Sequence, residues 1–107
     1  MSLDVELRVM KPVAVFDYNI THNLGDMADK AGVYFALWRP EELGLKKAFE
    51  LVPYLKVGLE RLKAQPEVFR KMDPSNLWGN YDDLVEFIEK YIKACLDSPD
   101  ADIWVSR

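Results

Sequence analysis

Hydrophobic and polar residues alternate near the start of the sequence. The apolar residues Val5, Leu7 and Val9 are separated from one another by charged residues. A repeat of two residues places apolar side chains on one face of a β-strand and charged side chains on the other. We therefore predict a strand over residues 4–9 with one face toward solvent.

The next segment is rich in β-branched and aromatic residues. Residues 13–20 read Val-Ala-Val-Phe-Asp-Tyr-Asn-Ile, a composition typical of strands. Large apolar side chains occur on both faces at its beginning, so we expect this strand to be central in a sheet. A third strand is expected over residues 102–106, after the helix breaker formed by residues 97–100.

Between these strands the apolar residues recur every three to four positions, which is the spacing of amphipathic helices. The pattern predicts three helices, the second of which should kink or split near Val52 because Pro53 lies inside it. Pro66 should begin one more helical turn, and Asn23 can cap the first helix through the backbone N–H of Asp26. The expected helices cover residues 24–38, 41–63 and 81–96.

The order β-β-α-α-(α)-α-β indicates the fold class. Helices grouped between terminal strands predict a single α+β domain over residues 1–107, with a small, mostly antiparallel three-stranded sheet covered on one face by helices. Because a strand at each end would tie both termini into the sheet, we do not expect the chain to be a fragment. The residues expected in the core are Phe87, Ile88, Tyr91, Leu55, Leu59, Phe35 and Val15.

Composition narrows the range of functions. Half of the 107 residues are hydrophobic and the net charge is −4, so we expect a real core and no binding to nucleic acid or to a membrane surface. The single cysteine, Cys95, excludes an internal disulfide framework and is expected to be buried and inert. No charged and apolar leader is evident, so we expect a cytoplasmic location.

One polar cluster lies where the second strand gives way to the first helix. Asn19, Thr21, His22 and Asn23 are followed by Gly25, which would let a ligand approach closely. A helix N-terminus offers free N–H groups and partial positive charge, so this segment can hold a polar or anionic ligand. The alternative is structural, because threonine and asparagine are ordinary capping residues and a neighbouring histidine often bonds to backbone.

Two aromatic clusters supply further candidates. Trp78 and Tyr81 precede the last helix and can stack on a planar ligand, although such a tryptophan more often closes the end of a core. Arg39, beside Trp38, can reach a phosphate or can pair with a surface glutamate.

Catalytic signatures are absent from the sequence. One histidine excludes metal motifs built on histidine pairs, and there is no glycine-rich phosphate loop or nucleophile elbow. We expect no metal and no cofactor. His22 is a catalytic candidate only as a general base, with Asp17 as the nearest carboxylate to orient it.

Charge is unevenly distributed along the chain. Residues 46–71 hold seven basic and three acidic side chains, whereas residues 72–102 hold eight acidic and two basic ones. Complementary segments of this kind can guide self-association, can face each other within one fold, or can be solvated surfaces. Together with the high apolar content they make a two-fold homodimer a possible state.

Three strings resemble segments of a group of small uncharacterised proteins from bacteria and bacteriophages. They are Tyr-Asn-Ile-Thr-His-Asn at 18–23, Asn-Leu-Trp-Gly-Asn-Tyr at 76–81, and the ending at 99–107. The resemblance spans most of the chain and implies a stand-alone small protein, but no mechanism.

Three functional hypotheses follow. The first is a non-catalytic binding module for a small polar or anionic ligand, nucleotide-like in character, held by the clusters around His22 and Trp78. The second is a protein–protein interaction or regulatory subunit that acts through exposed apolar parts of its helices. The third is a small enzyme that uses His22. The first requires the two clusters to meet in one pocket.

Overall fold

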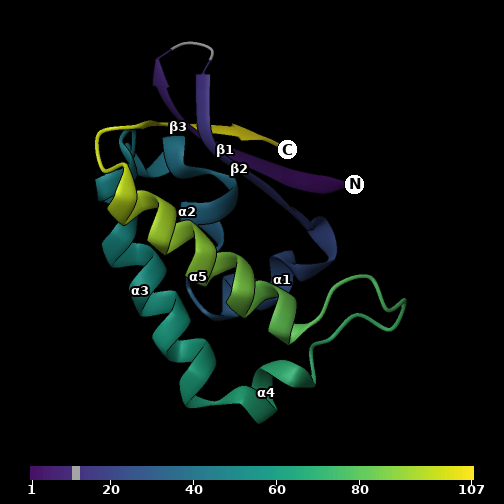
Figure 1. The fold of residues 1–107 in the computed structure, drawn as a ribbon. Helices are drawn as coiled ribbons and strands as arrows, with labels where there is room; N and C mark the ends of the chain where they lie inside the picture. Colours follow the sequence, from purple (N-terminus) through teal and green to yellow (C-terminus); the bar gives the residue numbers. More distant parts are fainter. Residues whose placement is uncertain (11–12) are drawn as a thin grey trace.

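The computed structural model describes residues 1–10 and 13–107. It contains a three-stranded antiparallel sheet and a group of helices, so the predicted α+β class is confirmed (Figure 1). The strands are β1 (Ser2–Met10), β2 (Val13–Thr21) and β3 (Asp102–Ser106), the 3₁₀ helices are η1 (His22–Leu24) and η2 (Pro40–Leu43), and the α-helices are α1 (Gly25–Lys30), α2 (Tyr34–Trp38), α3 (Ala48–Ala64), α4 (Pro66–Arg70) and α5 (Tyr81–Asp97).

The sheet has one apolar face and one polar face, as the alternating pattern predicts. Val5 of β1 lies directly opposite Tyr18 of β2 and Val105 of β3, and such opposed residues project from the same face. Val5 is fully buried. The other face carries Glu6, opposite Trp104 of β3. The strand order is β2-β1-β3, so β2 is an edge strand and its prediction as a central strand is wrong.

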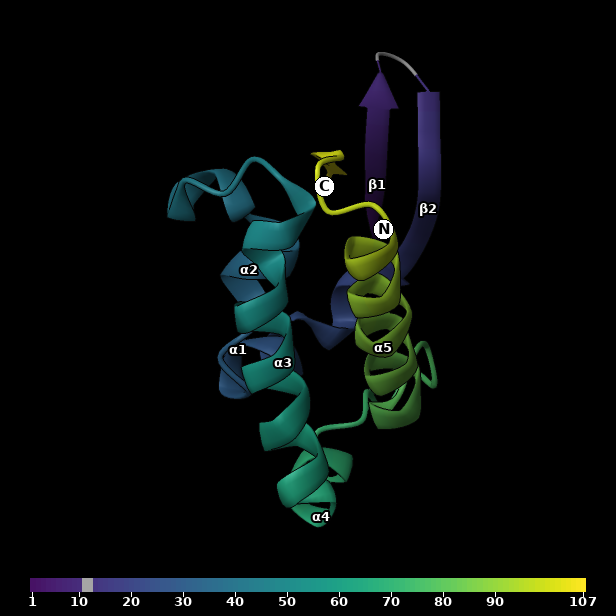
Figure 2. The same ribbon diagram turned by 60° about the vertical axis from the view of Figure 1, so that its left-hand side comes forward.

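The helices cover the apolar face of the sheet. α3 and α5 lie side by side beneath it (Figure 2). Phe16 and Tyr18 of β2 stack on Tyr91 and Phe87 of α5, with ring centres 5.7 and 5.5 Å apart. Stacked aromatic pairs add to the stabilisation that comes from burial alone. The stacks place α5 directly under β2.

The helix predicted over 24–38 is two helices. Gly32 has φ +78°, which ends α1, and two backbone bonds close the turn: Val33 N–H to the Ala28 carbonyl, and Gly32 N–H to the Asp29 carbonyl. This pair of bonds is a Schellman motif, a common way to end a helix at glycine. The apolar spacing continues through the break, which explains why the pattern alone predicted one helix.

The helix predicted over 41–63 is also interrupted, but not at proline. Gly44 adopts φ +72° after η2, and α3 begins only at Ala48. The Glu50 carboxylate closes the start of α3 by accepting from the N–H groups of Lys46 and Lys47 at 3.0 and 2.8 Å. α3 runs through Pro53 without a split. The carbonyl that loses its partner belongs to Phe49, a half-exposed residue near the helix start, where water can replace the missing N–H.

Most of the predicted core is confirmed, with two exceptions. Five of the seven residues are buried or pack against the core, and Cys95 is buried as expected, but Val15 is 48% exposed and Phe35 is 44% exposed. The register shifts between the pairs Leu7–Phe16 and Arg8–Ala14, so Val15 occupies a bulge with no residue opposite it. The break at Gly32 changes the direction in which Phe35 projects from α2.

Candidate functional site

The largest cavity described lies where β2 passes into η1 and α1. Its volume is about 600 Å³, which is within the range of small-molecule sites. Two of its walls come from α2 and from the residue that follows β3. The residues lining it are His22, Asn23, Gly25, Asp26, Asp29, Tyr34, Phe35, Trp38, Arg39 and Arg107. We call it the His22 cavity.

His22 lines this cavity, and one of its ring nitrogens is buried and unsatisfied. Its ring meets Trp38 edge to face, with centres 6.1 Å apart, and its Nε2 atom is buried without a hydrogen-bond partner among the described residues. A buried polar atom that lacks a partner costs about 1–3 kcal/mol. Thr21 rather than Asn23 caps η1, because the Thr21 hydroxyl accepts from the Asn23 N–H at 3.3 Å. The capping role predicted for Asn23 is therefore wrong, and its side chain is exposed at the cavity.

Two arginines supply positive charge at the rim. Arg107 donates to the Trp38 carbonyl at 2.7 Å and pairs with Glu41 at 3.0 Å. Arg39 pairs with Glu42 at 3.3 Å. Interaction with Tyr34, and to a smaller extent with Glu42, raises the pKa of the Arg39 guanidinium. These ion pairs are largely exposed, and exposed pairs are weak. An anionic ligand group can therefore compete with the glutamates for both arginines.

Two carboxylates place negative charge at the same cavity. Asp26 and Asp29 of α1 line the cavity, and no described residue forms a hydrogen bond or an ion pair with either side chain. They can accept hydrogen bonds from hydroxyl or amino groups. Beside them Tyr34 stacks on Trp38 with ring centres 5.3 Å apart and an interplanar angle of 8°, which gives the cavity an aromatic wall.

The remaining predicted site residues lie elsewhere. Asn19 and Thr21 line a separate cavity of about 280 Å³ between β2 and α5. Trp78 is 66% exposed and lines none of the cavities described above, and Tyr81 is buried. The structure thus brings His22, Asn23 and Arg39 together and leaves Trp78 and Tyr81 outside that group.

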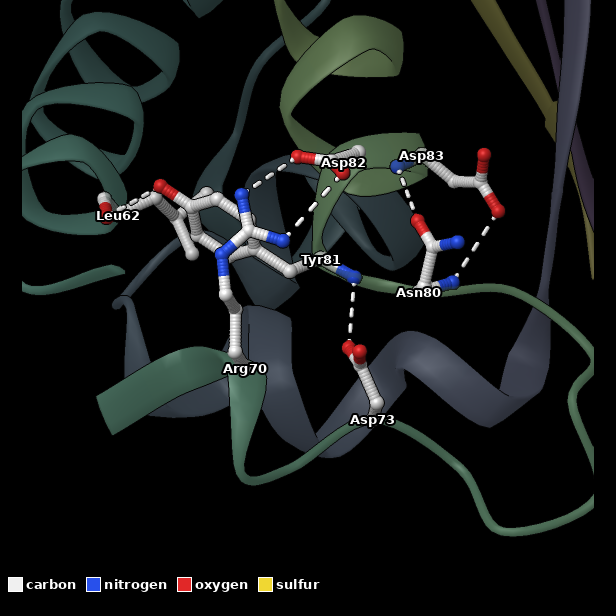
Figure 3. Close-up of polar contacts among 7 residues, drawn as sticks. All are labelled: Leu62, Arg70, Asp73, Asn80, Tyr81, Asp82 and Asp83. Carbon is white, nitrogen blue, oxygen red and sulfur yellow. Dashed lines mark hydrogen bonds and ion pairs between the residues drawn. The ribbon is translucent and has the colours of Figure 1, made fainter. Parts of the chain in front are cut away.

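Tyr81 anchors the loop that precedes α5 (Figure 3). Its hydroxyl donates to the Leu62 carbonyl and its backbone N–H donates to Asp73, both at 2.7 Å. The Arg70 guanidinium covers the ring at 4.6 Å and makes two hydrogen bonds to Asp82, at 3.0 and 3.3 Å. Every polar group of Tyr81 at this point has a partner, so its position is that of a structural anchor.

The start of α5 is closed in the same way. Asn80 accepts from the Asp83 N–H at 2.9 Å, and the Asp83 carboxylate accepts from the Asn80 N–H at 3.1 Å (Figure 3). This reciprocal arrangement is a capping box, and it confirms the predicted beginning of the last helix. Together with the bond from the Tyr81 N–H to Asp73, it occupies three N–H groups at this helix end.

The two predicted clusters do touch, since Gly79 lines the 280 Å³ cavity together with Asn19 and Thr21, but His22 and Trp78 share no described cavity. Gly79 has φ +86°, and a Cβ atom there would lie 2.6 Å from Cγ2 of Thr21. Glycine is needed at this position for both reasons. The loop before α5 therefore packs against the residue that precedes His22, while the Trp78 side chain is largely exposed.

The pairing of His22 with Asp17 that was predicted for a general base is not found among the described residues. Asp17 lies opposite Glu6 on the polar face of the sheet, and no described hydrogen bond joins the His22 side chain to a carboxylate. Within residues 1–10 and 13–107, no group of three or more histidine, cysteine, aspartate or glutamate side chains is arranged to hold a metal ion. None of the helices in that part of the chain is long and apolar enough to cross a membrane.

Sequence reasoning missed much of the cavity wall. Arg107 is 85 positions from His22 in the chain and reaches the site only because β3 pairs with β1. Asp26 and Asp29 are spaced three apart on α1, a spacing that places side chains on one side of a helix. That spacing was the one local signal available. Comparison of the chain with protein-family models, curated proteins and solved structures found no significant match.

Proposed function

We propose that the protein is a non-catalytic binding module for a small polar or anionic ligand that occupies the His22 cavity. The observation that carries the proposal is the buried, unpartnered Nε2 atom of His22 at the wall of a cavity that also holds two arginines. A turn of the His22 ring toward the cavity would bring Nε2 within reach of a ligand atom, and the bond formed there would remove the cost of leaving it unsatisfied. The binding energy of such a ligand includes that recovered cost.

The lining favours a nucleotide-like molecule. Arg39 and Arg107 can bind an anionic group in place of Glu41 and Glu42. The aromatic wall suits a planar ring, and Asp26 with its neighbour on α1 can accept from hydroxyl or amino groups. The net charge of −4 disfavours a large polyanion, so a small molecule fits better than DNA or RNA. Binding in the cytoplasm is part of this proposal.

A second candidate, self-association or partner binding through α3, has one observation in its favour. Phe49, Tyr54 and Val57 of α3 remain 53%, 42% and 48% exposed. A helix that is apolar on more than its buried face often has a second contact. A homodimer formed through α3 predicts a light-scattering mass of two chains at micromolar concentration, and Val57→Lys should return it to the mass of one chain. A mass of one chain for the unmodified protein removes this candidate.

The ligand proposal is tested by binding. Thermal unfolding in the presence of inorganic phosphate, nucleoside monophosphates and small dicarboxylates should show that at least one class raises the midpoint. Titration calorimetry with that compound should give at least a tenfold weaker affinity for His22→Ala and for Arg39→Ala. Lys56→Ala, which removes an exposed cation from α3, should bind like the unmodified protein. No shift with any class, or equal affinity for all variants, contradicts the proposal.

A further inference from the structure

β2 has one edge that pairs with nothing in the described chain. The strand is nine residues long and is bonded only to β1, and no backbone hydrogen bond reaches its other edge from residues 1–10 or 13–107. Alternate residues of an edge strand direct N–H and C=O groups outward, ready to pair with another strand. Natural edge strands of this length are usually covered or blunted.

A groove runs along this free edge, between β2 and α5. Two cavities lie in it, of about 250 and 280 Å³. Their α5 residues recur every three or four positions and so form one continuous side of the helix. The residues contributed by α5 are Asp83, Glu86, Phe87, Lys90, Lys93, Ala94 and Asp97. The β2 residues are consecutive, Val15–Phe16 in one cavity and Tyr18–Asn19–Ile20–Thr21 in the other, which places the strand's backbone at the wall.

Lys90 divides the groove into these two cavities. Its Nζ atom lies 3.5 Å from the Tyr18 hydroxyl and 5.1 Å from the centre of the Tyr18 ring, and it pairs with Glu86 at 2.8 Å. The cavities are centred about four strand residues apart, a separation of roughly 13 Å at 3.3 Å per residue. Side chains four apart in an extended chain project from the same face.

The two cavities differ in chemistry. Val15, Phe16 and Ala94 make one of them largely apolar. The other is lined by Asp83 and Glu86 beside Phe87. One oxygen of Asp83 accepts from the Asn80 N–H and one oxygen of Glu86 pairs with Lys90, which leaves the second oxygen of each carboxylate for a ligand. An extended segment with one apolar and one basic side chain, four positions apart, complements both.

We infer that the groove between β2 and α5 binds an extended peptide segment of a partner protein, which adds to the sheet as a strand beside β2. Main-chain hydrogen bonds to the free edge supply affinity, and the two cavities select the side chains. The groove spans Asp83 to Asp97, about 21 Å of helix, which matches roughly six residues of strand. This accounts for Val15, whose exposed side chain in the bulge forms part of the apolar cavity.

A second copy of the chain does not fit this edge. Antiparallel pairing of two β2 strands about a two-fold axis would place both α5 helices on the same face of the joined sheet. α5 lies directly under β2, through the stacks of Phe16 on Tyr91 and of Tyr18 on Phe87. Paired strands are about 4.8 Å apart, whereas packed helices need about 8–10 Å between axes. The helices would collide.

The test uses a phage-displayed library of random peptides of about seven residues. We expect enriched peptides with a basic and an apolar residue four apart, and at least tenfold weaker binding to Ala94→Trp and to Glu86→Lys. The matched controls Ala64→Trp and Glu60→Lys, on exposed positions of α3, should bind these peptides normally, as should His22→Ala.

Backbone pairing has its own signature. N-methylation of the bound peptide at successive positions should weaken binding at alternate residues only, and amide exchange should slow in residues 14–21. Failure to enrich any peptide, binding unaffected by the groove variants, or N-methyl effects without the two-residue period would overturn the inference.

Discussion

The segments around His22 and Tyr81 contain similar residues but differ in whether their polar atoms have hydrogen-bond partners. Each combines an aromatic ring with asparagine and glycine at the start of a helical segment. At Tyr81 the hydroxyl, the backbone N–H and the neighbouring cap all have partners within 3.1 Å. At His22 the Nε2 atom is buried beside a cavity without a partner.

That difference indicates a structural role for the Tyr81 segment and a candidate binding role for the His22 segment. A polar cluster whose hydrogen bonds are all made internally stabilises the fold and has nothing left for a ligand. A cluster with an unsatisfied atom at a cavity wall retains a binding capacity at a cost in stability. Substitutions in the Tyr81 segment should therefore change stability, and substitutions in the His22 segment should change binding.

The largest effect is expected at Tyr81. Tyr81→Ala removes a buried ring and the hydroxyl that bonds Leu62, so the free energy of unfolding should fall by about 3–5 kcal/mol. Urea unfolding measures this value. Tyr54→Ala, on an exposed tyrosine of α3, is the control and should cost less than about 1 kcal/mol. Similar losses for the two variants would mean that the Tyr81 network is not an anchor.

The Tyr91 hydroxyl is a second buried atom without a partner among the described residues, but unlike His22 it belongs to a residue of the closed core. Burial raises the pKa of Tyr91, and it raises the pKa of Cys95 to about 12. Above about pH 9 the unfolded chain releases these protons and the folded chain keeps them, so stability falls as pH rises. The loss for the thiol alone should reach about 3 kcal/mol by about pH 11.

Urea unfolding across this pH range checks the expectation. Tyr91→Phe and Cys95→Ala should each make the alkaline loss shallower, while at neutral pH Tyr91→Phe should be neutral or stabilising because it deletes an unsatisfied hydroxyl. Stability that stays constant from about pH 9 to about pH 11 would contradict the assignment of both groups to the dry core.

Replacing the two asparagines, Asn80 and Asn23, should have different effects on the free energy of unfolding, because only Asn80 caps a helix. Asn80→Ala removes the capping box of α5 and should cost about 1 kcal/mol. Asn23→Ala removes no cap, since Thr21 performs that role at η1, and should change stability by less than about 0.5 kcal/mol. Thermal unfolding of both variants compares them directly. A larger loss for Asn23→Ala would reverse the assignment of the two segments.

No loss of stability is expected at His22. His22→Phe keeps an aromatic ring against Trp38 and removes the unsatisfied nitrogen, so the free energy of unfolding should stay unchanged or rise by up to about 1 kcal/mol. Urea unfolding measures it. A loss of more than about 2 kcal/mol would show that the imidazole has a structural partner.

Local patterns predicted most of the fold and only part of the site. The periods of two and of three to four residues located the strands and the long helices, because each element has one buried face. The break at Gly32 was missed because the apolar period continues past it. The break at Gly44 was missed because Pro40, followed by two glutamates, is typical of a helix start. The place of β2 in the sheet depends on pairing between distant strands, which periodicity does not encode.

The site shows the same division. His22, Asn23 and Gly25 are close in sequence and were predicted together, and all three line the cavity. Arg107 joins them only through the pairing of β3 with β1. Trp78 does not line the His22 cavity. Gly79 and the capping box hold the loop against Thr21, and the indole of Trp78 remains largely exposed to solvent. That placement is set by backbone conformation, which residue type alone does not reveal.

His22 is the single histidine of the chain, so ligand binding at its ring can be followed without interference from another histidine. With ¹⁵N-labelled histidine, the imidazole nitrogens of His22 give unambiguous NMR signals. We predict that a nucleoside monophosphate, inorganic phosphate or a small dicarboxylate shifts the Nε2 signal in a saturable way, and that Arg39→Ala abolishes the shift at the same concentration. An Nε2 signal that none of these compounds moves, in a protein that remains folded, would contradict it.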